Sequence, residues 1–243
     1  MGTTDIKTAI AMFADRNAQG TIVQERTEAT LEMNDRSVLD KGCQRAVPAA
    51  GAVGKFLHNR EIYGEGDDAD AFFEVASGVV RICKFLVDGR RQIVAFYVPG
   101  DVFGFEVTAK HSLSAEAVCD SVVISHPRCR IETLAATSQV LSYQLFLHAM
   151  RRLTEAQDHS LLLGHRSAVE RVAAFLFDWS TRSLERKVVT LVMPRLDIAD
   201  YLGLTIETVS RTLSYLERKA LIELPTVRQI ILKDAAGLRD LNS

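Results

Sequence analysis

Three polar side chains in the C-terminal part of the chain have the types and the spacing needed to read DNA bases. In the segment TIETVSR, residues 205–211, Glu207 and Arg211 are four positions apart and Ser210 lies beside them, so a helix would place all three on one face. In the major groove an arginine bonds bidentately to guanine, a glutamate accepts from cytosine, and a serine is short enough to approach a base. The alternative is a surface ion pair between Glu207 and Arg211, which would contribute only about 0.3–0.5 kcal/mol.

The residues around this segment predict the helix-turn-helix that would present it. Gly203 stands where the turn between two helices requires a left-handed residue, Leu204 would fill the turn from beneath, and Thr205 can cap the second helix. The inward positions of both helices are apolar: Ile198, Ala199, Leu202, Val209, Leu213 and Leu216. Because the glycine, the cap and the apolar positions agree, the pattern favours base reading over the ion pair.

The chain after the second helix predicts a wing. Residues 220–234, ALIELPTVRQIILKD, hold two short strand-like runs on either side of Pro225-Thr226-Val227-Arg228. Hydroxyl and guanidinium groups near the wing and the helix ends are candidates for contact with the DNA backbone. These candidates are Thr205, Thr208, Arg228, Arg182, Ser183 and Arg186.

A long helix is predicted upstream, over residues 131–166. Its apolar positions recur at alternating steps of three and four, which is the pattern of a heptad seam. The seam runs through Phe146, Ala149, Leu153, Ala156, Ser160 and Leu163, and Met150 widens it. Such a helix can pair with a second copy of itself, and we predict a homodimer; the alternative is a helix that packs on its own domain. Residues 164–167 break the pattern, and a second helix follows within a C-terminal domain of residues 167–243.

The front half has the pattern of short antiparallel strands. Between residues 37 and 130, β-branched and aromatic runs are separated by the turn dipeptides Ser77-Gly78, Asp88-Gly89 and Pro99-Gly100. Such spacing predicts an antiparallel roll or sandwich. Residues 1–36 are a polar arm to which we assign no role. The predicted fold class is therefore α+β, with an arm, a β-roll, a dimerisation helix and a winged helix-turn-helix.

Net charge, apolar windows and missing motifs argue against a non-specific nucleic-acid binder, a membrane protein and an enzyme. Net charge is −2, from 29 Lys and Arg against 31 Asp and Glu, so only a few placed cations can contact DNA. No window approaches the ~18–20 apolar residues of a membrane span, and residues 1–20 lack the order of a secretory signal. We expect a cytoplasmic protein with no membrane partner. Hydrolase, zinc-protease and phosphate-loop motifs are missing, so we do not expect an enzyme.

A β-rich front half, a long heptad helix and a C-terminal winged helix together resemble the Crp/Fnr superfamily of bacterial transcription regulators, over about residues 37–243. The segment 207–211, ETVSR, is similar to the E-x-x-S-R recognition motif of the Fnr and FixK branches. The resemblance implies a homodimeric activator on a palindromic operator with TTGA-type half-sites, such as TTG-N8-CAA, and RNA polymerase as a partner. It further implies target genes for low-oxygen respiration, denitrification or nitrogen fixation.

The front half departs from the family members that bind cyclic nucleotides. Those members carry a G-E-L/F cassette, followed by R-S/T-A, that binds the phosphate. Here GFE at 104–106 is followed by LSA at 113–115, so a leucine stands where the phosphate-binding arginine would be. A buried phosphate would lack its counter-charge, and we expect no cyclic nucleotide.

The cysteines and histidines do not match the metal-binding branches either. Iron–sulfur members use a cluster of N-terminal cysteines, whereas residues 1–42 contain none. Haem-binding members pair a cysteine with a histidine, but no histidine follows Cys83 within ten residues; His111 and His126 are weak alternatives. The resemblance therefore implies a FixK-type regulator with no cofactor and no metal, whose activity follows its expression level.

Two further hypotheses stay open. The roll could hold an unidentified small-molecule effector that gates DNA binding. Alternatively, a cysteine could sense oxidants. The four cysteines are scattered and form no C-x-x-C pair, which is typical of reduced thiols. Cys129 is the redox candidate because it lies between two arginines, and positive neighbours favour the reactive thiolate; Cys43, two residues before Arg45, is a weaker one.

Overall fold

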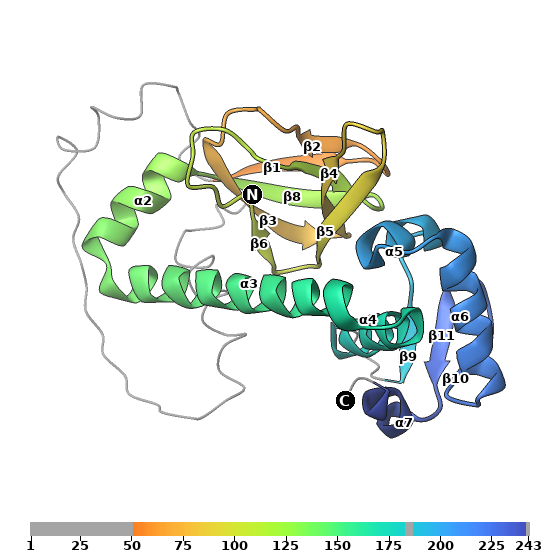
Figure 1. Ribbon diagram of the computed structural model, residues 1–243. Coiled ribbons are helices and arrows are strands. Elements are labelled where there is room, and N and C mark those ends of the chain that lie inside the picture. Colours follow the sequence, from red (N-terminus) through yellow and green to blue (C-terminus); the bar gives the residue numbers. More distant parts are fainter. Residues whose placement is uncertain (1–50, 183–186, 242–243) are drawn as a thin grey trace.

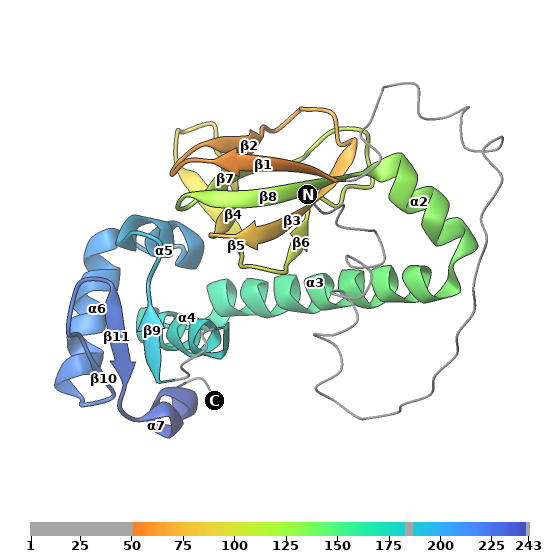
Figure 2. The same cartoon turned by 180° about the vertical axis from the view of Figure 1, so that it is seen from behind.

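A computed structural model describes residues 51–182 and 187–241 of the chain. An antiparallel β-roll is followed by a long helix that runs beneath it and by a C-terminal helical unit with a small sheet (Figure 1, Figure 2). The arm predicted for residues 1–36, the beginning of the roll as far as residue 50, and the candidates Ser183 and Arg186 lie outside the described residues.

The roll consists of two four-stranded sheets whose paired strands are all antiparallel. One sheet has the order β1-β8-β3-β6 and the other β2-β7-β4-β5. The strands are β1 (Ala52–Phe56), β2 (Glu61–Tyr63), β3 (Ala71–Ser77), β4 (Val80–Phe85), β5 (Arg91–Tyr97), β6 (Val102–Phe103), β7 (Ser114–Ala117) and β8 (Ser121–Pro127). The predicted antiparallel roll is confirmed.

The hairpin between β4 and β5 turns at the predicted dipeptide Asp88-Gly89. Gly89 has φ of 83°, a left-handed conformation that costs a residue with a Cβ atom more than it costs glycine. The Asp88 carboxylate accepts from the backbone N–H of Arg90 at 3.1 Å, which is the usual role of Asp in a turn. Beyond the turn, Phe85 pairs with Arg91 and the ladder continues to Val80 and Tyr97.

The range 131–166, expected to be one helix, contains parts of two. Helix α2 (Arg128–Thr137) ends at Ser138, and α3 (Gln139–His165) begins directly after it. Ser138 has an extended backbone, with φ −116° and ψ 103°, and its hydroxyl accepts from the N–H of Leu141 at 3.3 Å. Ser138 thus caps α3 and separates it from α2. The apolar periodicity that predicted the long helix lies within α3.

The C-terminal unit has the elements of a winged helix. Its helices are α4 (Ala168–Arg182), α5 (Arg195–Leu202), α6 (Ile206–Arg218) and α7 (Ala235–Asp240). Its strands are β9 (Val188–Thr190), β10 (Ile222–Glu223) and β11 (Gln229–Leu232), in the order β10-β11-β9. Strands β10 and β11 form the predicted wing. Strand β9 was not predicted; it completes the sheet by pairing with β11. The predicted α+β class is confirmed.

The apolar core does not stop at the boundary between the roll and the C-terminal unit. One cluster fills the roll around Val75 and Phe103. A larger cluster runs from Phe96 of β5 into the C-terminal unit, where the Phe96 ring lies 5.8 Å from that of Trp179, edge to face, and 5.3 Å from that of Tyr201. The two units therefore share buried surface. Among the described residues, no helix has the length and apolarity needed to cross a membrane.

Candidate nucleic-acid interface

The turn between α5 and α6 has the geometry that the sequence predicts. Gly203 ends α5 in the left-handed conformation, with φ 61° and ψ 39°. A Cβ atom there would approach no atom closer than 3.6 Å, so the backbone conformation, and not lack of space, is what favours glycine. Thr205 then caps α6, because its hydroxyl accepts from the N–H of Thr208 at 3.2 Å.

The inner face of α6 is buried as expected. Val209, Leu213 and Leu216 are at most 1% exposed, and each contributes about 1.5–3 kcal/mol through removal of apolar surface from water. They pack in one cluster with Ile198 and Leu202 of α5. The orientation of α6 is therefore fixed against α5, and whatever moves α5 also moves α6.

The outer face of α6 presents the three predicted base-reading residues. Glu207 and Arg211 are exposed and Ser210 is half-buried at their side. Both charged side chains belong to the described part of the chain, and no ion pair joins them in it. The surface ion pair considered as the alternative is thus not formed, and the two groups stay available to a ligand.

Two further elements surround this face. The N-terminal turn of α6 carries Thr205, which is exposed, and Thr208, which is half-buried. Their hydroxyl oxygens are 3.0 Å apart. At the wing, Arg228 is exposed next to Val227, and Thr226 orders the loop by accepting from the N–H groups of Arg228 at 3.3 Å and Gln229 at 3.0 Å. Thr205, Thr208 and Arg228 thus remain candidates for phosphate contact.

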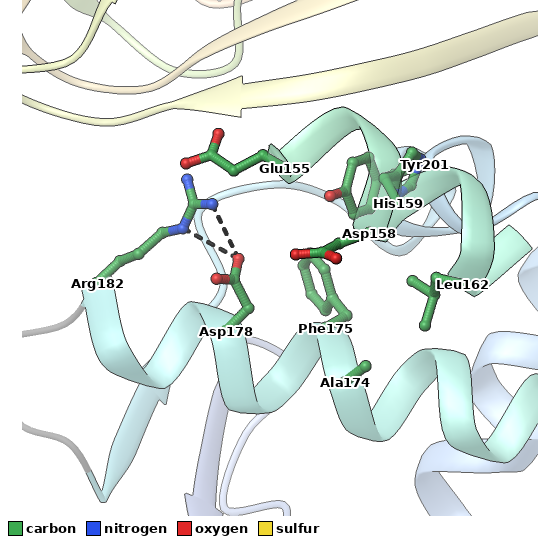
Figure 3. A pocket seen from close by; sticks show the side chains of 9 residues that line it. All are labelled: Glu155, Asp158, His159, Leu162, Ala174, Phe175, Asp178, Arg182 and Tyr201. Carbon is green, nitrogen blue, oxygen red and sulfur yellow. Dashed lines mark hydrogen bonds and ion pairs between the residues drawn. The ribbon is translucent and has the colours of Figure 1, made fainter. Parts of the chain in front are cut away.

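Arg182 has a different position. It borders a cavity of about 270 Å³ between α3, α4 and Tyr201 of α5 (Figure 3). Its guanidinium lies 3.0 Å from the Asp178 carboxylate and donates to the Phe96 carbonyl of the roll at 3.2 Å. Burial opposes the charge, but the Asp178 and Asp101 carboxylates outweigh it and hold the pKa of Arg182 above its usual value. These bonds at the junction of the two units argue against the predicted phosphate contact.

The predicted dimer seam is largely exposed on α3. Phe146 is 57% exposed, Leu153 49% and Met150 43%, and Ala149 and Ala156 are exposed as well. Leu163 differs because it is half-buried and its side chain approaches Gly203. A row of apolar side chains on one helix, without cover from the described part of the same chain, is the surface that a second copy would bury.

Sequence reasoning missed an ion-pair network that joins α5 to the roll. Arg81 of β4 contacts Asp197 at 2.7 Å and Glu116 at 2.7 Å, and Arg91 of β5 pairs with Asp197 and, at 2.8 Å, with Asp200. Burial opposes the charge of Arg91, but its bonds to Asp200 and Asp197 hold its pKa above the usual value. An arginine within the apolar strand VRICKF and two acids three apart in RLDIADYL were the available signals.

In the part of the roll that departs from the cyclic-nucleotide cassette, several polar groups bind each other, whereas the buried His111 Nδ1 has no hydrogen-bond partner. Glu106 accepts from the backbone N–H of Ser112 at 3.0 Å and from its hydroxyl at 2.9 Å. The hydroxyl of Ser114, which is 5% exposed, accepts from the N–H of Glu65 at 2.9 Å. Lys84 pairs with Glu65 at 2.6 Å. Glu106, Ser114 and Lys84 are thus engaged within the roll itself.

The cysteines have different environments. Cys83 is fully buried, and burial together with the Glu116 carboxylate raises the pKa of its thiol to about 12, so it stays protonated. Cys129 lies half-buried in the first turn of α2 and is disulfide-bonded, so the expectation of a reduced thiol is wrong at this position. Its redox role stays a prediction. Cys43 lies outside the described residues. Among the described residues, no group of three or more His, Cys, Asp or Glu side chains has a metal-binding arrangement.

Comparison with known proteins identifies the family. Residues 170–241 match the Crp-like helix-turn-helix domain and residues 54–138 the cyclic nucleotide-binding domain. The chain is 45% identical over 204 residues to the nitrogen fixation regulation protein FixK of Azorhizobium caulinodans, covering 82% of each chain. It is 42% identical over 189 residues to FixK of Rhizobium meliloti, covering 78% of this chain and 86% of that one.

A solved structure agrees with these relatives. The structure of FixK2 from Bradyrhizobium japonicum superimposes with a TM-score of 0.77 at 41% identity and covers 80% of this chain and 98% of that one. Regulators, and not enzymes, are what the chain resembles along most of its length. The chain belongs to the Crp/Fnr family, in its FixK-like branch, and is a transcription activator that binds DNA through its helix-turn-helix.

Proposed function

We propose that the protein acts as a homodimer that binds a palindromic operator with TTGA-type half-sites and needs no bound cofactor. The observation that carries the proposal is the outer face of α6, where Glu207 and Arg211 are exposed in the N-terminal half of the second helix and form no ion pair within the described part of the chain. In a helix-turn-helix this end enters the major groove. Arg211 reads guanine there, Glu207 accepts from the cytosine of the opposite strand or contacts a neighbouring adenine, and Ser210 contacts a base beside them.

The phosphate contacts come from the edges of this face. Thr205 and Thr208 lie at the N-terminus of α6, where backbone N–H groups and the helix dipole favour an anion. Arg228 approaches the backbone from the wing. Such contacts fix the register of the protein on the duplex and leave sequence discrimination to the base-reading residues.

Pairing of α3 with its copy makes the operator palindromic. The exposed seam residues Phe146, Met150 and Leu153 would become buried in the pair, and that burial supplies the driving force. A two-fold axis along α3 then places two copies of α6 about 34 Å apart, one turn of DNA. Operator symmetry follows from protein symmetry.

The absence of a cofactor requirement is supported by the roll itself. Leu113 stands where a phosphate-binding arginine is needed, and the neighbouring Glu106 carboxylate is engaged by Ser112. Regulation through expression level is consistent with such a roll. We assign target genes in low-oxygen respiration, denitrification or nitrogen fixation, and the names of the relatives support the last of these. The loops of the roll are the surface that we assign to RNA polymerase.

The direct test is binding of the purified protein to a fluorescent duplex that carries TTGAT-N4-ATCAA, with no ligand or metal added. The matched control is the same duplex with both guanines changed. We expect tight binding to the first and at least about thirtyfold weaker binding to the second, because two base pairs are lost at about 1–3 kcal/mol each. Weak, equal binding to both duplexes would overturn the proposed operator and the independence from an effector.

The oligomeric state needs its own test. Leu153→Glu introduces a charge at the centre of the seam and should convert the dimer to a monomer in sedimentation-velocity runs. Val107→Glu is the matched control, because Val107 is a 98% exposed valine on the roll. A monomeric wild type, or a Leu153→Glu variant that stays dimeric, would contradict the pairing through α3.

A further inference from the structure

We propose that Arg81 and Arg91 of the roll are positioning residues for DNA binding: through Asp197 and Asp200 they hold α5, and with it α6, at a fixed place relative to the roll. We call these four residues the α5 clamp. In the dimer the clamp sets the separation between the two copies of α6, so this inference rests on the proposed palindromic operator. The roll then fixes the operator spacing directly, without a ligand.

The clamp is built of charges that are withdrawn from water. Arg81 is 4% exposed and Asp197 1%. The two carboxylate oxygens of Asp197 are divided between two strands, because Oδ2 accepts from Arg81 of β4 at 2.7 Å and Oδ1 from Arg91 of β5. Arg91 also donates to Asp200 Oδ2 at 2.9 Å. A single carboxylate that is bound from two strands can occupy only one position on the sheet.

Further hydrogen bonds orient both arginines. Arg81 donates to Glu116 through Nε at 2.8 Å and to the Asn59 side chain at 3.1 Å. Because both partners belong to the roll, the roll by itself orients the Arg81 guanidinium. Gln92, next to Arg91, donates to the Asp200 carbonyl at 2.7 Å and so grips the backbone of α5 as well. Arg81, Arg91 and Gln92 of the roll thus form one binding surface for α5, the first helix of the helix-turn-helix.

Apolar packing alone does not explain why charges lie here. Phe96 already packs on Trp179 and Tyr201, and that contact supplies adhesion between the two units. A buried ion pair adds little net adhesion, because desolvation offsets most of its Coulomb energy. Its specific effect is registry, since any sliding of α5 along the sheet would leave a buried charge unpaired.

The C-terminal unit is attached at a second point, close to α3. Arg171 of α4 donates to the carbonyls of Leu163 at 2.7 Å and Arg166 at 2.9 Å, at the end of α3, and to Leu202 at 3.0 Å, at the end of α5. Between α3 and α4 the chain is extended at Arg166, with φ −101° and ψ 144°. If the clamp opens, the unit keeps this attachment and the apolar contact at Phe96, but α5 is no longer fixed in register on the sheet.

The clamp makes a prediction that a purely structural role does not make. Loosening it should leave each helix-turn-helix able to read its half-site but should relax the preference for one spacing between half-sites. Arg91→Gln is the chosen variant, because Arg91 lies at the rim of the network, with a side chain 15% exposed, so the fold is expected to survive its loss. Arg90→Gln is the matched control, because Arg90 is 76% exposed and pairs with Asp88 in the hairpin.

Binding is measured on duplexes in which the two half-sites are separated by two to six base pairs, and on a duplex with a single half-site. The wild type and Arg90→Gln should favour one spacing by at least about tenfold over its neighbours. Arg91→Gln should lose that preference and at least about tenfold in affinity at the favoured spacing, a factor that corresponds to about 1.4 kcal/mol. Its affinity for the single half-site should equal that of the wild type. Arg91→Lys, which keeps the charge but not the planar fork, should restore the preference in part.

The chain supplies a readout that does not need DNA. Trp179, the single tryptophan, is 5% exposed and lies at the contact with Phe96. Acrylamide should quench its fluorescence more strongly in Arg91→Gln than in the wild type or in Arg90→Gln. If quenching increases as expected while the wild type binds none of the duplexes, the operator assignment fails and the clamp stands. Unchanged quenching, an unchanged spacing preference, or an equal loss on the single half-site would overturn the clamp.

Discussion

Helices α5 and α6 are neighbours in the winged helix, and each carries an acid in its first turn, Asp197 and Glu207. Their environments are opposite. Asp197 is 1% exposed and is bound by guanidinium groups of the roll, whereas Glu207 is exposed and has no ion-pair partner in the described part of the chain. The local chemistry is the same, since an acid near a helix N-terminus is favourable in both cases. What differs is the surroundings: the roll supplies guanidinium partners to Asp197, whereas Glu207 faces outward, where we propose that DNA binds.

The largest effect that tests this difference is on stability. Asp197→Ala removes the carboxylate that Arg81 and Arg91 share, so that each guanidinium loses an ion-pair partner and the deeply buried Arg81 keeps only Glu116. We expect the free energy of unfolding to fall by about 3–5 kcal/mol in a urea titration. Glu207→Ala is the matched control and should change it by no more than about 0.5 kcal/mol, as for most surface substitutions. Equal losses in the two variants would remove the distinction between the two helices.

The exposed face should show the reverse behaviour. Arg211→Ala is expected to lower operator affinity by about 1–3 kcal/mol without measurable loss of folding stability, because we propose that the guanidinium contacts DNA and it forms no ion pair with any described side chain. Titrations on the operator and on a duplex with the guanine replaced form a double-mutant cycle. Replacing the guanine should lower the affinity of Arg211→Ala only slightly, since the arginine that pairs with the guanine is already absent. A full additional loss would mean that another residue reads that base.

His148, on the α3 helix that runs beneath the roll, should make the folding stability depend on pH. Burial, with the nearby charge of Arg152, lowers the pKa of His148 on α3 from 6.5 to about 4. The unfolded chain therefore binds a proton at His148 between about pH 6.5 and pH 4 that the folded chain refuses. Stability attributable to this histidine is present above pH 6.5 and is lost as the pH falls through that window.

The size of this effect is expected to be about 1–2 kcal/mol, because solvent screens a side chain that is only partly buried. The measurement is the free energy of unfolding of the wild type and of His148→Gln at a series of pH values and one protein concentration. The difference between the two curves should slope across the window. Parallel curves would show that His148 is protonated in the folded protein as readily as in the unfolded chain.

The helix-turn-helix was predictable because its signals are local. Gly203, Thr205 and the apolar positions around them lie within about one helical turn of the feature that each one specifies, and the structure places them as expected. The interruption at Ser138 was not predicted, because a serine caps a helix as readily as it sits on the surface of one. The clamp was out of reach for another reason: Arg81 and Asp197 are 116 positions apart, and no periodicity within either segment pairs them.

The smallest predicted effect concerns the junction between the two helices. Thr205→Ala removes the hydroxyl that accepts from the N–H of Thr208, and Thr205→Ser keeps it. The loss of a helix cap costs about 1 kcal/mol, and Thr205→Ala should reduce both folding stability and operator affinity, whereas Thr205→Ser should retain both within a few tenths of a kcal/mol. If the hydroxyl only caps α6, the losses of affinity and of stability should be equal. A larger loss of affinity than of stability would assign the hydroxyl a phosphate contact as well. Equal losses would limit Thr205 to capping and leave Thr208 and Arg228 to hold the DNA backbone.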